Sequence, residues 1–143
     1  MSTETVRYET ELPQLFELLR AIEGTIAASP FDAGLRHLVK LRVSQINQCA
    51  YCVKMHASEA RADGETDERL DRLVVWAHVA DFTAAEKAAL AWAEALTVID
   101  GRTDYATLRS ELRRVQFSEV DITALTAAVA MINLWNRFQI SAH

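Results

Sequence analysis

Turn-forming residues are scarce in this sequence. Its 143 residues include only four glycines and two prolines, whereas an all-β fold needs many turns of the kind these residues make. Hydrophobic residues make up 50% of the chain, and many of them are alanine, which favours helix. We therefore expect an all-α protein with a single domain over residues 1–143.

Basic charge and long apolar runs are also lacking. The formal net charge of −5 argues against a nucleic-acid surface or an anionic membrane as a partner. The longest apolar run, around residues 127–134, is too short to span a bilayer. The first twenty residues mix charged and polar side chains with isolated apolar ones and do not resemble a secretory signal. We expect a cytoplasmic protein.

Cysteine is rare, and both copies lie in one short motif. Cys49 and Cys52 are followed by His56, so the three side chains would share one face of a helix. Two cysteines one turn apart lie roughly 5–6 Å apart at Cα, which a disulfide tolerates. A helix N-terminus favours thiolate over thiol, and a histidine one turn later can take or return a proton. The motif predicts a redox-active dithiol with His56 as its acid/base partner.

Two other interpretations of the motif remain open. The cysteines could be small buried hydrophobic residues. Alternatively, Cys49, Cys52 and His56 could bind structural zinc with His37 as the fourth ligand. That spacing is unusual for a zinc finger, because three of the four ligands would lie on one continuous helix.

The hydrophobic periodicity and capping residues predict a compact bundle of about six to seven helices. The second helix begins either at Pro30, with Ser29 as N-cap, or at Ala33. A break near Asn47 and Gln48 must separate the second and third helices, although no glycine or proline enforces it. The expected ranges are 12–28, 30–47 or 33–47, 50–63, 66–76, 83–99, 104–115 and 118–139.

Other polar and aromatic residues on the helices are expected to be structural. Three tryptophans fall on apolar stripes and are predicted to lie in the core or at an interface, and three polar residues interrupt the last helix and are predicted to bridge helices or subunits. These residues are Trp76, Trp92, Trp135, Asn133, Asn136 and Arg137.

The run from Leu41 to His56, LRVSQINQCAYCVKMH, closely resembles the core of the AhpD-like alkylhydroperoxidases of the carboxymuconolactone decarboxylase superfamily. The likeness continues through residues 60–65, 82–86, 90–95 and 132–137, and the core motif spans residues 37–56. The resemblance implies an all-helical fold that forms homo-oligomers, commonly trimers or hexamers. It also implies peroxidase chemistry without metal, flavin or another cofactor.

The resemblance also implies a role for each reactive residue. Cys52 would attack the hydroperoxide and become a sulfenic acid, and Cys49 would resolve it as a disulfide that a dithiol or protein reductant reopens. His56 would belong to a proton relay. The family's relay carboxylate lies twelve residues before the first cysteine, where this chain has His37. Three carboxylates could replace it: Glu59, Glu65 and Glu94.

The leading hypothesis is therefore a thiol-dependent (alkyl)hydroperoxide reductase with antioxidant function. The alternative is a non-catalytic or weakly catalytic redox-sensing oligomer, motivated by His37 at the relay position. A decarboxylase is the least favoured reading, because the decarboxylating relatives do not use this cysteine pair.

Overall fold

The computed structural model describes residues 4–143, and this part of the chain is helical with no strand. The prediction of an all-α bundle is confirmed, but the count of six to seven helices is too low. Eight α-helices and one 3₁₀ helix are present in the described residues: α1 Tyr8–Glu11, α2 Pro13–Ala27, α3 Ala33–Ile46, α4 Ala50–Ala62, α5 Asp67–Arg72, η1 Leu73–His78, α6 Ala84–Thr97, α7 Tyr105–Arg114 and α8 Glu119–Ser141.

Two local features account for the additional helices. The four-residue α1 precedes α2, and Pro13 starts α2. The N–H that proline lacks has no partner within the helix at this first position, so no hydrogen bond is lost. The predicted helix over residues 66–76 divides into α5 and η1, and Val75 inside η1 has non-helical dihedral angles. None of the helices in the described residues is long and apolar enough to cross a membrane.

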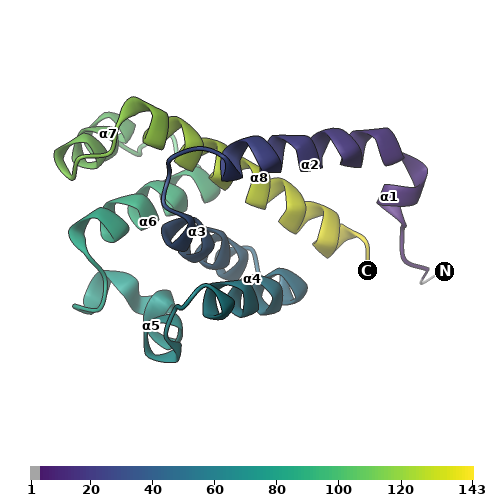
Figure 1. The fold of residues 1–143 in the computed structure, drawn as a ribbon, viewed down its shortest axis with the longest axis horizontal. Helices are drawn as coiled ribbons and strands as arrows, with labels where there is room; N and C mark the ends of the chain where they lie inside the picture. Colours follow the sequence, from purple (N-terminus) through teal and green to yellow (C-terminus); the bar gives the residue numbers. More distant parts are fainter. Residues whose placement is uncertain (1–3) are drawn as a thin grey trace.

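Helix α3 is the central element of the bundle. It packs against α4, α6 and α8, and Leu38, Val39 and Val43 on it are completely buried. Figure 1 shows α3 and α4 side by side, with α6 and α8 around them. The cysteine motif thus begins at the end of a helix that packs against three others.

The start of α3 corrects one sequence prediction. Ser29 does not cap this helix; its hydroxyl instead donates to the carbonyl of Ile26 at the end of α2. The N-cap is Asp32, whose carboxylate accepts the N–H of Leu35 at 2.8 Å. A carboxylate at this position satisfies a free N–H group and interacts favourably with the helix dipole.

The last residues of three helices form the same left-handed turn. After α3, the N–H of Gln48 bonds to the carbonyl of Gln45 and the N–H of Cys49 to that of Ser44. This is the Schellman pattern, which glycine normally provides. Gly64 closes α4 in this way with φ of 97°, whereas Gln48 and Gln116 do so after α3 and α7 with φ of 58° and 74°.

Helix α2 lies across α8 on one side of the bundle (Figure 1). Leu19 and Ile26 pack against Ala128 and Met131 in a small second core. The two ends of the described chain also meet, since the N–H of Val6 donates to the carbonyl of Ala142 at 3.1 Å. This packing brings Glu23 of α2 over the groove between α3, α4 and α8.

Replacing either left-handed glutamine by glycine should stabilise the protein. A side chain in this conformation costs about 1–2 kcal/mol, whereas glycine loses about 0.5–1 kcal/mol of extra chain entropy. We expect Gln48→Gly and Gln116→Gly each to raise the free energy of unfolding by about 0.5–1 kcal/mol, measured by urea denaturation in one redox state.

Gly64→Ala is the reverse control. A Cβ at this position would meet nothing within 4 Å, so only backbone strain should act, lowering stability by about 1 kcal/mol. A loss of stability in Gln48→Gly would contradict this account of the turn.

Candidate active site

The cysteine motif begins where α3 ends. Cys49 is the N-cap of α4, in extended conformation, and its sulfur accepts the N–H of Cys52 at 3.4 Å. The left-handed Gln48 supplies the break that the sequence analysis required. Cys49 and Cys52 form a disulfide with a Cα–Cα distance of 5.3 Å. The two sulfurs therefore face each other at the N-terminus of a helix, where the dipole stabilises a thiolate.

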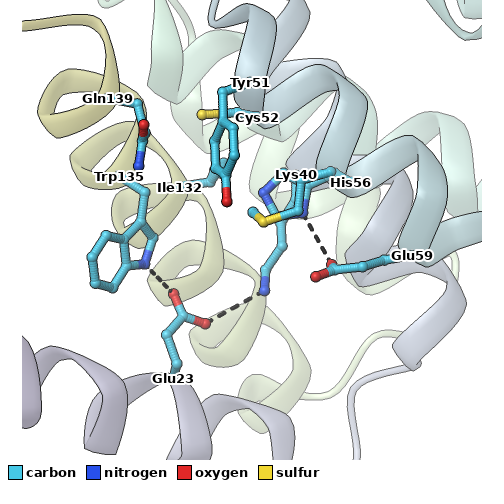
Figure 2. A pocket seen from close by; sticks show the side chains of 10 residues that line it. Glu23, Lys40, Tyr51, Cys52, His56, Glu59, Ile132, Trp135 and Gln139 are labelled. Carbon is cyan, nitrogen blue, oxygen red and sulfur yellow. Dashed lines mark hydrogen bonds and ion pairs between the residues drawn. The ribbon is translucent and has the colours of Figure 1, made fainter. Parts of the chain in front are cut away.

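Both cysteines are buried, but they have different surroundings. Cys52 lines a cavity of about 380 Å³ between α2, α3, α4 and α8, and Cys49 is not among its lining residues. Figure 2 shows the cavity, with Tyr51 and Trp135 facing each other across it. Its walls are formed by Glu23, Lys40, Tyr51, Cys52, Met55, His56, Glu59, Ile132, Trp135 and Gln139. A ligand in this cavity would lie against Cys52.

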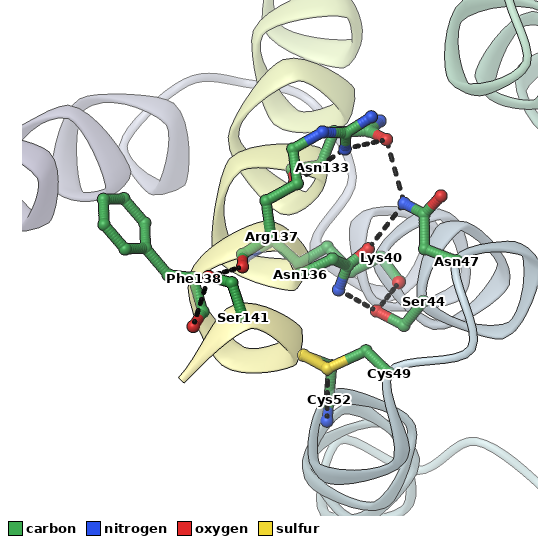
Figure 3. Close-up of a disulfide and its surroundings, with 10 residues drawn as sticks. All are labelled: Lys40, Ser44, Asn47, Cys49, Cys52, Asn133, Asn136, Arg137, Phe138 and Ser141. Atoms are coloured by element: carbon green, nitrogen blue, oxygen red, sulfur yellow. Dashed lines mark hydrogen bonds between the residues drawn. A yellow bond between two sulfur atoms is a disulfide. The ribbon is translucent and has the colours of Figure 1, made fainter. Parts of the chain in front are cut away.

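Cys49 lies beside a network of polar side chains (Figure 3). The amide of Asn47 donates to the side-chain oxygens of both Asn133 and Asn136, at 2.9 Å each. The buried amide of Asn136 in turn donates to the hydroxyl of Ser44 at 3.1 Å. These bonds join the end of α3 to α8, which is the bridging role expected for these asparagines, and they hold the turn that carries Cys49.

His56 is buried in the cavity wall and is oriented by a carboxylate. Its Nδ1 lies 3.2 Å from Oε2 of Glu59, one turn later on α4. Because Nδ1 is directed to Glu59, Nε2 is the ring nitrogen left for another partner. Burial lowers the pKa of His56 below its usual value, although Glu59 acts in the opposite direction.

His37 lies close to the same carboxylate. Its Nδ1 is 3.8 Å from Oε2 of Glu59, and its Nε2 is 2.5 Å from Oδ2 of Asp63. The structure therefore brings His37, Glu59 and His56 together on the facing sides of α3 and α4. The described residues contain no cluster of His, Cys, Asp and Glu that could hold a metal. The zinc interpretation thus has no support.

The two other candidate carboxylates are engaged elsewhere. Glu65 pairs with Arg69 at 2.7 Å. Glu94 accepts hydrogen bonds from Arg42 and Trp76, each at 2.8 Å. Glu59 is therefore the one carboxylate among the three that lies at the histidine pair.

The carboxymuconolactone decarboxylase family model matches residues 13–95, which include the cysteine motif, His37 and His56. The chain belongs to this family. It is 32% identical over 139 residues to the uncharacterised protein YdfG of Bacillus subtilis, a match that covers 97% of this chain and 94% of YdfG.

Solved structures extend the comparison to the fold. A protein of unknown function from Agrobacterium tumefaciens, described provisionally as the antioxidant defence protein AhpD, has 34% identity and a TM-score of 0.89, covering 98% of this chain and 95% of its own. The debrominase Bmp8 has 21% identity and a TM-score of 0.81, covering 93% and 71%. The likeness to the debrominase is one of fold alone. The family match confirms the resemblance that the sequence motif indicated.

Within this member of the carboxymuconolactone decarboxylase family, sequence reasoning missed a charged bridge across the cavity. One oxygen of Glu23 accepts the indole N–H of Trp135 at 2.9 Å, and the other lies 3.4 Å from the ammonium of Lys40. The three residues come from α2, α8 and α3 (Figure 2). Nothing local in the sequence marks this bridge, because Glu23 and Trp135 are 112 positions apart.

The lowered pKa of His56 predicts how stability depends on pH. Between its folded pKa and its unfolded value of 6.5, the unfolded state binds more protons, so stability rises with pH in that window. The contribution of neutral His56 to the free energy of unfolding is fully present above about pH 6.5 and is lost as pH falls through the folded pKa. We expect His56→Gln to reduce the loss of unfolding free energy between about pH 7 and pH 5.

Denaturant unfolding at a series of pH values would measure this effect. His78→Gln is the matched control, because His78 is exposed and should leave the pH dependence as it is in the parent protein. A steeper loss of stability in His56→Gln than in the parent would contradict the assignment.

Proposed function

We propose that the protein is a thiol-dependent hydroperoxide reductase. The observation that carries this proposal is the position of Cys52, which lines an open cavity together with His56 and is disulfide-bonded to a second cysteine with no cavity surface. A nucleophilic sulfur, a proton carrier and a resolving sulfur are the three groups that a peroxide-reducing dithiol needs.

The proposed reaction begins with reduced cysteines. His56 takes the proton of Cys52, and the thiolate attacks one peroxide oxygen. The O–O bond breaks, the sulfur keeps that oxygen as a sulfenic acid, and the leaving alkoxide receives the proton from His56. Cys49 then attacks the sulfur of Cys52, the disulfide forms, and water leaves.

An external dithiol completes the cycle by thiol–disulfide exchange. It gives up two electrons and two protons, becomes a disulfide, and restores both cysteines. Because Cys52, and not Cys49, lines the cavity, we propose that the reductant also attacks the sulfur of Cys52. The second thiol of the reductant then attacks the reductant's own sulfur in the mixed disulfide, which releases Cys52 and the oxidised reductant.

We also propose that the protein works as a homo-oligomer, a trimer or hexamer. Several large apolar side chains are exposed on the single chain, among them Leu18, Ile22, Val98 and Ile99. Contact with further copies would remove them from water. The alternative function, a redox sensor whose dithiol controls assembly, predicts different sizes for the reduced and oxidised forms, whereas a reductase keeps one size.

Peroxide consumption by cysteine variants tests the reductase. With cumene hydroperoxide and excess dithiothreitol, we expect Cys52→Ser to lower the protein-dependent rate more than about 100-fold, and Cys49→Ser to lower it less, because dithiothreitol can itself reduce the sulfenic acid of Cys52. Without reductant, Cys49→Ser should still consume one equivalent of peroxide, because Cys52 is intact, whereas Cys52→Ser should consume none. His78→Gln serves as the control for a remote substitution. Equal rates in the parent and both cysteine variants would dispose of the proposal.

A further inference from the structure

Glu59 occupies an unusual position between two imidazoles. Its Oε2 is 3.2 Å from Nδ1 of His56 and 3.8 Å from Nδ1 of His37. On the far side of His37, Asp63 accepts or shares a proton with Nε2 at 2.5 Å. The four side chains form a row that begins in the cavity wall, where His56 is 6% exposed, and ends at Asp63, which is 55% exposed.

His56 needs a negative charge beside it if it is to hold a proton. Apart from burial, the nearby Lys40 ammonium and His37 both oppose protonation of His56, and Glu59 is the group that favours it. Glu23, on α2, also lines the cavity but pairs with Lys40. Cys52 and Tyr51 are the remaining titratable residues of the cavity wall. The balance of charge around His56 therefore depends on Glu59.

His37 helps to determine where Glu59 lies. Its Nε2 is occupied by Asp63, while its buried Nδ1 has no hydrogen-bond partner among residues 4–143. This nitrogen faces Oε2 of Glu59 from α3, whereas His56 faces the same oxygen from α4. The carboxylate is thus held at the contact between the two helices and close to His56, although the Glu59 side chain is 45% exposed.

We propose that Glu59 is the positioning residue that replaces the missing relay carboxylate, and that His37 and Asp63 hold it beside His56. In this arrangement Nδ1–H of His56 donates to Glu59, and Nε2 accepts the proton of the Cys52 thiol. The S–H bond breaks, an N–H bond forms, and the resulting thiolate and imidazolium are stabilised by the adjacent carboxylate. The same proton then passes to the alkoxide, so the step balances without another reactant.

The proposal rests on the proposed function for its part in turnover, but thiol activation can be measured without turnover. In a Cys49→Ser background, the rate at which iodoacetamide alkylates Cys52 is followed from about pH 5 to pH 9. Glu59→Gln removes the charge and keeps the shape. Because His56 then holds a proton less well, the Cys52 pKa should rise and alkylation at pH 7 should fall roughly tenfold.

Two further variants separate charge from structure. Glu68→Gln changes a carboxylate on α5 that is 71% exposed and pairs only weakly with Arg72, and it should leave the alkylation profile unchanged. His37→Glu added to Glu59→Gln places a carboxylate at the position where the family has one and should recover most of the lost rate.

The outcomes distinguish this proposal from the reductase itself. Identical alkylation profiles for Glu59→Gln and Glu68→Gln would overturn the role of Glu59, even if the parent protein consumes peroxide. Failure of His37→Glu to recover the rate would also overturn it, because the loss would then not come from missing charge. If the parent consumes no peroxide while Glu59→Gln still slows alkylation, the proposed function fails and the role of Glu59 in thiol activation stands.

Discussion

The arrangement of the site depends on one left-handed residue. Gln48 reverses the chain between α3 and α4 with φ of 58°, and the following residue, Cys49, already caps α4. A turn this short places the two helices side by side. His37 and Lys40 on α3 consequently face His56 and Glu59 on α4, and the disulfide lies at the closed end of the pair.

The surroundings of this turn give the two sulfurs different properties. On the side of Cys49, hydrogen bonds between Asn47, Ser44 and Asn136 fasten α3 to α8. On the side of Cys52, the wall opens into a cavity whose charges are Lys40, Glu23, His56 and Glu59. Cys49 thus lies beside a polar network, whereas Cys52 lines space that a small molecule can enter. This asymmetry matches a division between a resolving and an attacking cysteine.

The charges of the cavity also form a connected set. Glu23 holds Lys40 and Trp135 together across three helices, which limits how strongly the ammonium can act on His56. Glu59 provides the opposing negative charge from α4. Removal of any one of these groups would therefore alter the proton affinity of His56 through its neighbours as well as directly.

Local features of the sequence predicted most of the fold and the centre of the site. Helical periodicity placed Cys49, Cys52 and His56 on one face, and capping residues marked the starts of α6 and α8. The start of α3 was left open between Pro30 and Ala33, and Asp32, which caps the helix by accepting the N–H of Leu35, was not identified.

Other parts of the site depend on contacts between distant segments. Glu59 lies three positions after His56, but the sequence did not distinguish it from Glu65 and Glu94 as the carboxylate at the site, because the partners of all three are known only from the fold. The bridge from Glu23 to Trp135 and Lys40 leaves no trace in local sequence. Nor does the left-handed conformation of Gln48, because glutamine has no special tolerance for it.

The most direct test of this account is the order in which the two thiols react. The reduced parent protein is treated with a small neutral alkylating reagent for increasing times, and labelled peptides are measured by mass spectrometry. Because Cys52 lines the cavity and Cys49 does not, we expect Cys52 to be labelled roughly tenfold sooner or more. Labelling of Cys49 first, or of both at one rate, would contradict the account.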